Sequence, residues 1–197
     1  VEDLLAERGI DICHETVRFW WNRFGPMFAA DIKRQRISRM RGFRNWRWHV
    51  DEVFVKINGE THYLWRAVDH EGEILESYVT KRRDKKAALL FFKKALKRHG
   101  KADAIVTDGL KSYPAALKEL GIEERREMER WLNNRVENSH LPFRRRERVM
   151  SRFRRMKTLQ KFASVHANVH NHFNSDRHLI DRQTYIACPS SAPMAQI

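Results

Sequence analysis

The chain has 197 residues, 42% of them hydrophobic, which is enough for one substantial core and a small appendage. Its 39 lysines and arginines outweigh 25 acidic residues, so the net charge of +14 indicates a nucleic-acid partner. No apolar run approaches the roughly 18 residues of a membrane span, so no membrane partner is expected. The two cysteines, Cys13 and Cys188, are far apart, which excludes a cysteine zinc site and disfavours a disulfide framework.

Residues 1–25 predict two helices joined by a turn at Gly9. The second helix, from about 14 to 24, has an apolar stripe that we expect to be buried: Val17, Trp20, Trp21 and Phe24. Such a pair is typical of a helix-turn-helix, whose second helix would place Arg18 and Arg23 against DNA. A plain helical hairpin is the alternative. The unit would be partial, because a further helix normally precedes the pair.

Residues 26–45 are expected to form a basic linker, because Gly25-Pro26 should end the second helix. Between residues 31 and 47 the only acid is Asp31, among seven lysines and arginines. Aromatic residues lie between these cations, and the combination suits phosphate contacts and base stacking. A solvated linker is the alternative explanation.

From Trp48 the pattern changes to that of strands, expected over 49–57, 61–68 and 74–79, with Asn58-Gly59 as a hairpin turn. The remaining elements are expected in the order of a helix over 84–98, a strand over 102–107, a helix over 111–120, a helix from Glu137 and a last helix over about 158–173. This order predicts an α/β domain over residues 46–178, with a mixed sheet flanked by helices. Residues 179–197 have little pattern and are expected to be an irregular tail.

Three carboxylates fall where they could meet. Asp51 lies within the first strand, Asp108 ends the fourth, and Glu137 lies on a following helix. If strands one and four are neighbours, the aspartates converge at the strand end where ligands gather in such sheets. Three carboxylates repel one another unless cations lie between them, and hard oxygen ligands favour two Mg²⁺ ions, with Mn²⁺ as a substitute.

Each carboxylate also has an ordinary explanation. Asp51 could be an exposed strand residue, and Asp108 could form a turn before Gly109. Glu52, beside Asp51, should point to the opposite face of the strand.

Basic residues gather around and after Glu137. His140 and Arg144 share its helix face and could hold a polyanion, although a surface ion pair is the alternative. The run continues as the densest in the chain, through Arg144, Arg145, Arg146, Arg148, Arg152, Arg154, Arg155 and Lys157. We expect this surface to follow DNA phosphates, with a merely solvated face as the alternative.

Three stretches of the chain resemble the IS6 family of bacterial insertion-sequence transposases, and the similarity runs from about residue 2 to about residue 178. They are WHVDEVFVKINGETHYLWRAVD, IVTDGLKSY and WLNNRVENSHLPFRRRERVMSRFRRMKTLQKFASVHANVHNHFN. The resemblance implies a DDE enzyme with an RNase H-like fold and a catalytic, metal-binding triad of Asp51, Asp108 and Glu137. It also implies that Arg144, seven residues after the glutamate, touches DNA where the family often has lysine. The 28 residues from 109 to 136 are fewer than in many members.

The resemblance further implies a function, partners and a location. The chain would cut double-stranded DNA at transposon terminal repeats and join the 3′-hydroxyl to target DNA, as a homodimer or higher oligomer in the bacterial cytoplasm, at the nucleoid. Two alternatives remain open: a nuclease of the same fold without strand transfer, and a truncated, catalytically inactive DNA-binding remnant of a transposon.

Overall fold

The computed structural model describes residues 2–40, 47–70, 72–128, 134–150 and 153–174, apart from the side chains at 36, 39, 40, 135 and 174. The strands are β1 (Arg47–Ile57), β2 (Glu60–Val68), β3 (Ile74–Thr80), β4 (Ala104–Thr107) and β5 (Arg126–Glu127). The helices are α1 (Glu2–Ala6), α2 (His14–Met40), α3 (Lys85–His99), α4 (Ser112–Glu119), α5 (Asn134–Val149) and α6 (Met156–Asn174), with a 3₁₀ turn at Glu123–Arg125.

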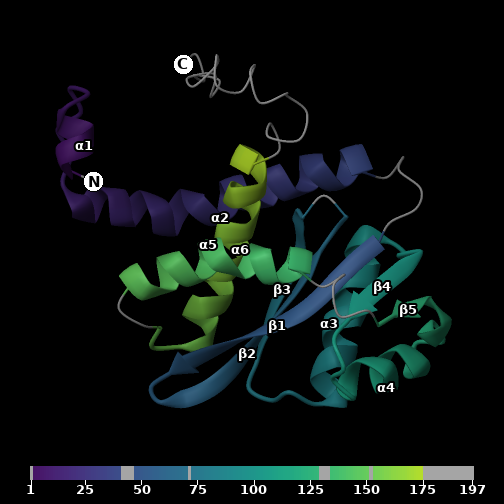
Figure 1. The fold of residues 1–197 in the computed structure, drawn as a ribbon. Coiled ribbons are helices and arrows are strands. Elements are labelled where there is room, and N and C mark those ends of the chain that lie inside the picture. Colours follow the sequence, from purple (N-terminus) through teal and green to yellow (C-terminus); the bar gives the residue numbers. More distant parts are fainter. Residues whose placement is uncertain (1, 41–46, 71, 129–133, 151–152, 175–197) are drawn as a thin grey trace.

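The strands form one mixed sheet in the order β3-β2-β1-β4-β5 (Figure 1). β1 and β2 are antiparallel and are joined at Asn58 and Gly59, whose positive φ angles of 51° and 85° suit a tight two-residue hairpin. β1 and β4 are parallel, with Val50 opposite Thr107. The expected neighbourhood of the first and fourth strands is therefore confirmed.

Helices cover both faces of the sheet. Both faces of β1 carry buried apolar side chains, so each face needs a cover. Trp48 and Val50 pack toward α3 and α4, where Phe91, Phe92 and Tyr113 complete one core. The other core lies under α5 and α6 and contains Val53, Val55, Ile57, Leu64, Val79, Phe143, Phe153, Leu159, Phe162 and Ala163. The predicted mixed sheet flanked by helices is confirmed.

The prediction that Gly25-Pro26 ends the second helix is wrong, because α2 continues through Pro26 to Met40. Proline has no N–H to donate, so the carbonyl of Asn22, four residues earlier, loses its partner within the helix. Lys161 of α6 takes the place of that donor, with its Nζ 3.1 Å from the Asn22 oxygen. A tertiary contact thus keeps the helix intact where the local sequence predicts a break. The division into domains at 25, 45 and 178 stays a prediction, and the expected tail at 179–197 lies outside the described residues.

The N-terminal pair of helices differs in part from expectation. α1 ends at Ala6, three residues before the predicted Gly9, and a turn leads to Gly9, where φ is +72° and the next residue, Ile10, donates its N–H to the Leu5 carbonyl at 2.9 Å. The stripe expected to be buried is not, since Trp20, Trp21 and Phe24 are 46%, 41% and 37% exposed. The reason is visible in Figure 1, where α1 lies at the outer end of α2, away from the sheet. A helix-turn-helix role stays a prediction.

Candidate active site

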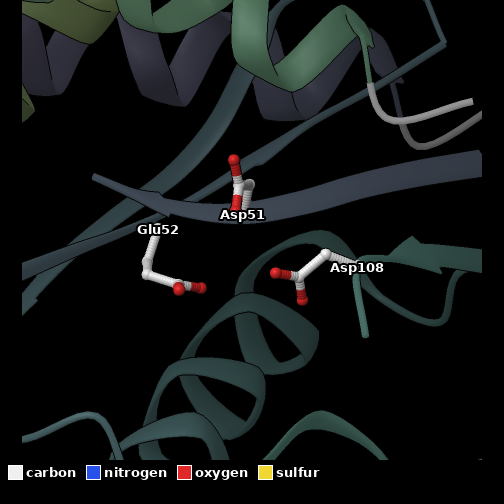
Figure 2. Close-up of side chains that lie close together, drawn as sticks. All are labelled: Asp51, Glu52 and Asp108. Atoms are coloured by element: carbon white, nitrogen blue, oxygen red, sulfur yellow. The ribbon is translucent and has the colours of Figure 1, made fainter. Parts of the chain in front are cut away.

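Asp51 and Asp108 meet because their strands are parallel neighbours. Asp108 follows Thr107, which pairs with Val50, so it lies level with Asp51 across the β1–β4 boundary. Oxygens of Asp51, Asp108 and Glu52 all lie within 4.8 Å of one another, as Figure 2 illustrates. The predicted convergence of the two aspartates is present in the structure.

Glu52 points to the opposite side of β1 from Asp51, as expected from strand geometry, yet its carboxylate still belongs to this group (Figure 2). It accepts a 2.7 Å hydrogen bond from the hydroxyl of Tyr113 on α4. The Arg83 guanidinium pairs with Glu52 and lies 3.8 Å from an Asp108 oxygen. Arg83 and Tyr113 were not among the predicted site residues, because nothing in the local pattern of either indicates this distant contact.

The turn after β4 fixes the orientation of Asp108. Its Oδ1 accepts from the backbone N–H of Leu110 at 3.0 Å, which is the local turn that aspartate forms readily. Arg126 of β5 donates to the Asp108 carbonyl at 3.1 Å and to the Thr107 hydroxyl at 2.9 Å. Asp108 therefore forms the local turn and also belongs to the group of three carboxylates, while its catalytic role stays a prediction.

The acidic group is short of positive charge. Burial, together with the negative charges of Glu52, Asp108 and Glu137, raises the pKa of Asp51 to about 7. Burial also raises the pKa of Glu52, although Tyr113 and Arg83 oppose the shift. The donors are all hard oxygens, and Arg83 is the one cation paired with them among the described residues. This donor set fits Mg²⁺ or Mn²⁺ and does not fit a thiolate-preferring metal.

α5 crosses the sheet beside Asp51. His140 Nδ1 lies 3.9 Å from an Asp51 oxygen, and Arg144 donates to the Phe54 carbonyl of β1 at 2.6 Å. His140 and Arg144, two of the three residues predicted to share a helix face, thus contact β1. Glu137 itself is exposed in the first turn of α5 and lies outside the group of three carboxylates described above. Its role as the third ligand stays a prediction.

Comparison with known proteins identifies the family. Residues 45–176 match the family model described as a DDE domain, from transposases of the IS240 type. The chain belongs to the IS6 family of DDE transposases. It is 29% identical over 145 residues to the IS431mec transposase of Staphylococcus aureus, covering 71% of this chain and 62% of that protein. It is 30% identical over 156 residues to an uncharacterised protein of Methanocaldococcus jannaschii, covering 79% of this chain and 67% of that one.

Solved structures with a similar fold include the catalytic core of the HTLV-2 integrase in a magnesium complex. That match has a TM-score of 0.47 at 14% identity and covers 66% of this chain and 86% of that one. The sheet order and the family match make this IS6-family domain RNase H-like, as expected. The chain spans only 62% of the length of the IS431mec transposase.

A buried arginine fastens α5 in this family member. Arg66 of β2, the cross-strand partner of Asp51, is 1% exposed and donates to the Ser139 carbonyl of α5 at 2.7 Å. Its guanidinium also lies 5.8 Å from the centre of the Phe143 ring. Burial lowers the pKa of Arg66 to about 9, and burial together with Arg66 and Arg144 lowers the pKa of His140 to about 3. His140 is therefore uncharged at neutral pH, and its expected contact with DNA stays a prediction.

The other predicted DNA contacts of this IS6-family transposase lie mostly on the surface. Arg145, Arg148, Arg154 and Arg155 are exposed around the end of α5 and the start of α6, and Arg18 and Arg23 are exposed on α2. Arg144 is half-buried and bonds to Glu147 at 2.6 Å as well as to β1. Arg152 lies outside the described residues. Contact with DNA by any of these side chains stays a prediction. No helix in the described part of the chain is long and apolar enough to cross a membrane.

Proposed function

We propose that this chain carries the catalytic machinery of an insertion-sequence transposase, which cuts DNA at transposon ends and joins the freed end to target DNA. The observation that carries the proposal is the meeting of Asp51 and Asp108 at the β1–β4 boundary, in a chain that belongs to the IS6 family. Two Mg²⁺ ions are the proposed cofactor, with Mn²⁺ as a substitute. Asp51 and Asp108 would hold them, and Glu137 is the proposed third ligand.

The reaction consists of two displacements at phosphorus. In the first, a water oxygen attacks a phosphodiester and the P–O3′ bond breaks, leaving a 3′-hydroxyl and a 5′-phosphate. In the second, that 3′-hydroxyl attacks a target phosphodiester, so one P–O bond forms as another breaks. When bound, the metal pair supplies charge stabilisation for the attacking and leaving oxygens.

The chain's own residues orient these groups. Asp51 lies on β1 and Asp108 directly follows β4, where the Leu110 amide and Arg126 hold it in place. Contacts with Arg83 and Tyr113 fix the orientation of the Glu52 side chain. Its negative charge therefore acts on the metal site from a fixed position. The exposed arginines at the end of α5 would contact DNA phosphates, and transposon terminal repeats and target DNA are the proposed partners. A homodimer or higher oligomer on DNA belongs to the same proposal.

Cleavage and joining assays test this function. We expect Mg²⁺-dependent nicking of terminal-repeat DNA by the unaltered chain, and none by Asp108→Asn or Glu137→Gln. Asp103→Asn is the matched control, because Asp103 is an exposed aspartate just before β4. Retained nicking by Glu137→Gln would remove Glu137 from the proposed triad.

Supplying pre-cut ends separates the proposed function from its rivals. Joined products support a transposase, whereas cutting without joining indicates a nuclease. DNA binding with neither reaction indicates an inactive remnant and overturns the proposal.

A further inference from the structure

A basic groove runs along the free edge of the sheet at β3, between α2, α3 and α6. Its volume is about 840 Å³. One acidic residue, Glu76, is among its lining residues. The cations that line it come from three helices: Lys33, Arg34, Lys94, Lys97, Arg98 and Lys161.

Glu76 cannot neutralise this groove. Its carboxylate is 3% exposed and is held by Lys33 at 3.1 Å and Arg98 at 2.6 Å, so two cations already surround one anion. Lys161 donates to the backbone and side chain of Asn22. A hydrogen bond to a neutral oxygen leaves that positive charge uncompensated.

Three cations of the groove, Arg34, Lys94 and Lys97, take part in no buried ion pair among the contacts of the described residues. Lys97 is exposed, and Lys94 lies with its Nζ 4.5 Å from the centre of the Tyr78 ring. Arg34 pairs at 2.9 Å with Asp31, but both side chains are more than half exposed, so water screens the pair. These charges are available to an external anion.

The composition of the groove favours a polyanion over a protein partner. Four of its six cations are lysines, a residue type that is depleted in protein–protein interfaces. The exposed aromatic side chains of α2 lie toward its other end, between Phe19 and Phe28, and line no part of the groove. A regular row of phosphates is the ligand whose charge this lining matches.

The groove is separate from the acidic site. β2 lies between β3 and β1, so the β3 edge and the strand that carries Asp51 are about 10 Å apart across the sheet. The groove also lies apart from the arginines at the end of α5, none of which lines it. DNA seated there would be held by residues other than those of the acidic site and of the end of α5.

We propose that this groove binds the phosphodiester backbone of a second stretch of duplex DNA, outside the stretch that meets Asp51 and Asp108. The inference rests on the proposed function in one respect, namely that the chain acts on DNA. It assigns to Arg34, Lys94 and Lys97 a role in affinity and none in chemistry.

The salt dependence of binding tests the groove directly. The test variant is Arg34→Gln/Lys94→Gln/Lys97→Gln, which leaves intact the Lys33 and Arg98 contacts to Glu76. The matched control, Lys86→Gln/Lys101→Gln/Lys118→Gln, removes the same charge from exposed positions outside the groove. Fluorescence anisotropy with a labelled random duplex in EDTA measures binding without cleavage, and circular dichroism checks that both variants fold.

We expect the slope of log Kobs against log salt to become shallower by up to about 2.7 in the groove variant, since each phosphate contact contributes about 0.9. The control should keep the slope of the unaltered chain. Equal slopes in the two variants overturn the proposal. So does a groove variant whose slope is unchanged but whose sedimentation shows a changed oligomer, because the groove would then hold another copy of the chain.

The outcome does not depend on catalysis. The same titration in an Asp108→Asn background should give the same loss of slope, because Asp108 lies outside the groove. If the chain cuts no DNA but the groove variant shows the shallower slope, the groove proposal stands and the proposed transposase activity is overturned. If the chain cuts DNA but the groove variant keeps its slope, only the groove proposal is overturned.

Discussion

The two faces of the sheet are built differently, although β1 supplies residues to both. The face under α3 and α4 is an aromatic core. The ring centroid of Trp65 lies 6.2 Å from that of Phe91 and 5.6 Å from that of Tyr113. The face under α5 and α6 also contains apolar residues, but polar contacts cross it. Arg66 bonds to the α5 backbone, and Asn171 of α6 bonds to both backbone groups of Ile74.

This difference separates two tasks. Apolar packing is non-directional, so it supplies stability without fixing the rotation of a helix to a single value. Hydrogen bonds from buried side chains to backbone are directional, and they set where α5 and α6 lie along the strands. The face that holds the helix of Glu137 and His140 is therefore the one where buried side chains bond to backbone groups of a neighbouring element, whereas the buried Tyr113–Glu52 contact on the opposite face joins two side chains.

The largest expected effect distinguishes the neighbours Asp51 and Glu52, which point to opposite faces. Asp51→Asn should lower Mg²⁺-dependent cleavage by at least about a thousandfold, because loss of a metal ligand removes several kcal/mol of charge stabilisation. Glu52→Gln keeps an acceptor for the Tyr113 hydroxyl and loses charge only toward Arg83, so a loss of about tenfold is expected. Single-turnover nicking rates measure both.

Equal losses in the two variants would mean that Glu52 is itself a metal ligand. Metal binding would then involve side chains from both faces of β1, contrary to the assignment of separate roles to the two faces.

The second prediction concerns stability on the aromatic face. Phe91→Ala should lower the free energy of unfolding by about 3–5 kcal/mol, because Phe91 is fully buried between Trp65 and Phe92. Leu90→Ala is the matched control on the same helix; its side chain is 55% exposed, and a change within about 0.5 kcal/mol is expected. Urea unfolding followed by circular dichroism measures both. A small effect of Phe91→Ala would show that this face is loosely packed.

The third prediction concerns a polar anchor on the other face. Asn171→Ala removes the side-chain hydrogen bonds to the buried N–H and carbonyl of Ile74, which should lower the free energy of unfolding by about 2–4 kcal/mol. Asn168→Ala, one turn earlier on α6, removes only a contact to Ser164 within the same helix, and at most about 1 kcal/mol is expected. Hydrogen exchange of the β3 amides reports the same contrast. Equal effects of the two substitutions would contradict the claim that the contacts between Asn171 and Ile74 hold α6 against β3.

Most of the elements could be predicted from sequence because they depend on local patterns, whereas the meeting of the aspartates could be predicted only on the condition that the first and fourth strands are neighbours. Alternation along 49–57, the Asn58-Gly59 turn and the buried strand before Asp108 each have a signature within a few residues. The continuity of α2 could not be predicted, because it depends on Lys161 replacing a missing donor 139 residues away. Nor could the contacts of Glu52, since Arg83 and Tyr113 reach it only after the sheet and both helices have formed.

The contact between Lys161 and Asn22 divides α2 into an inner arm, which reaches the groove, and an outer arm, which reaches α1. From Asn22 the inner arm runs 11 residues to Lys33 (33 − 22), and the outer arm runs 8 residues to His14 (22 − 14). At 1.5 Å per residue these arms are about 16 Å and 12 Å long. If α2 turned as a rigid rod about this contact, a sideways displacement of the inner arm would move the end that carries α1 in the opposite direction, by about three quarters as much. Arg18 lies on the outer arm and would be displaced with it.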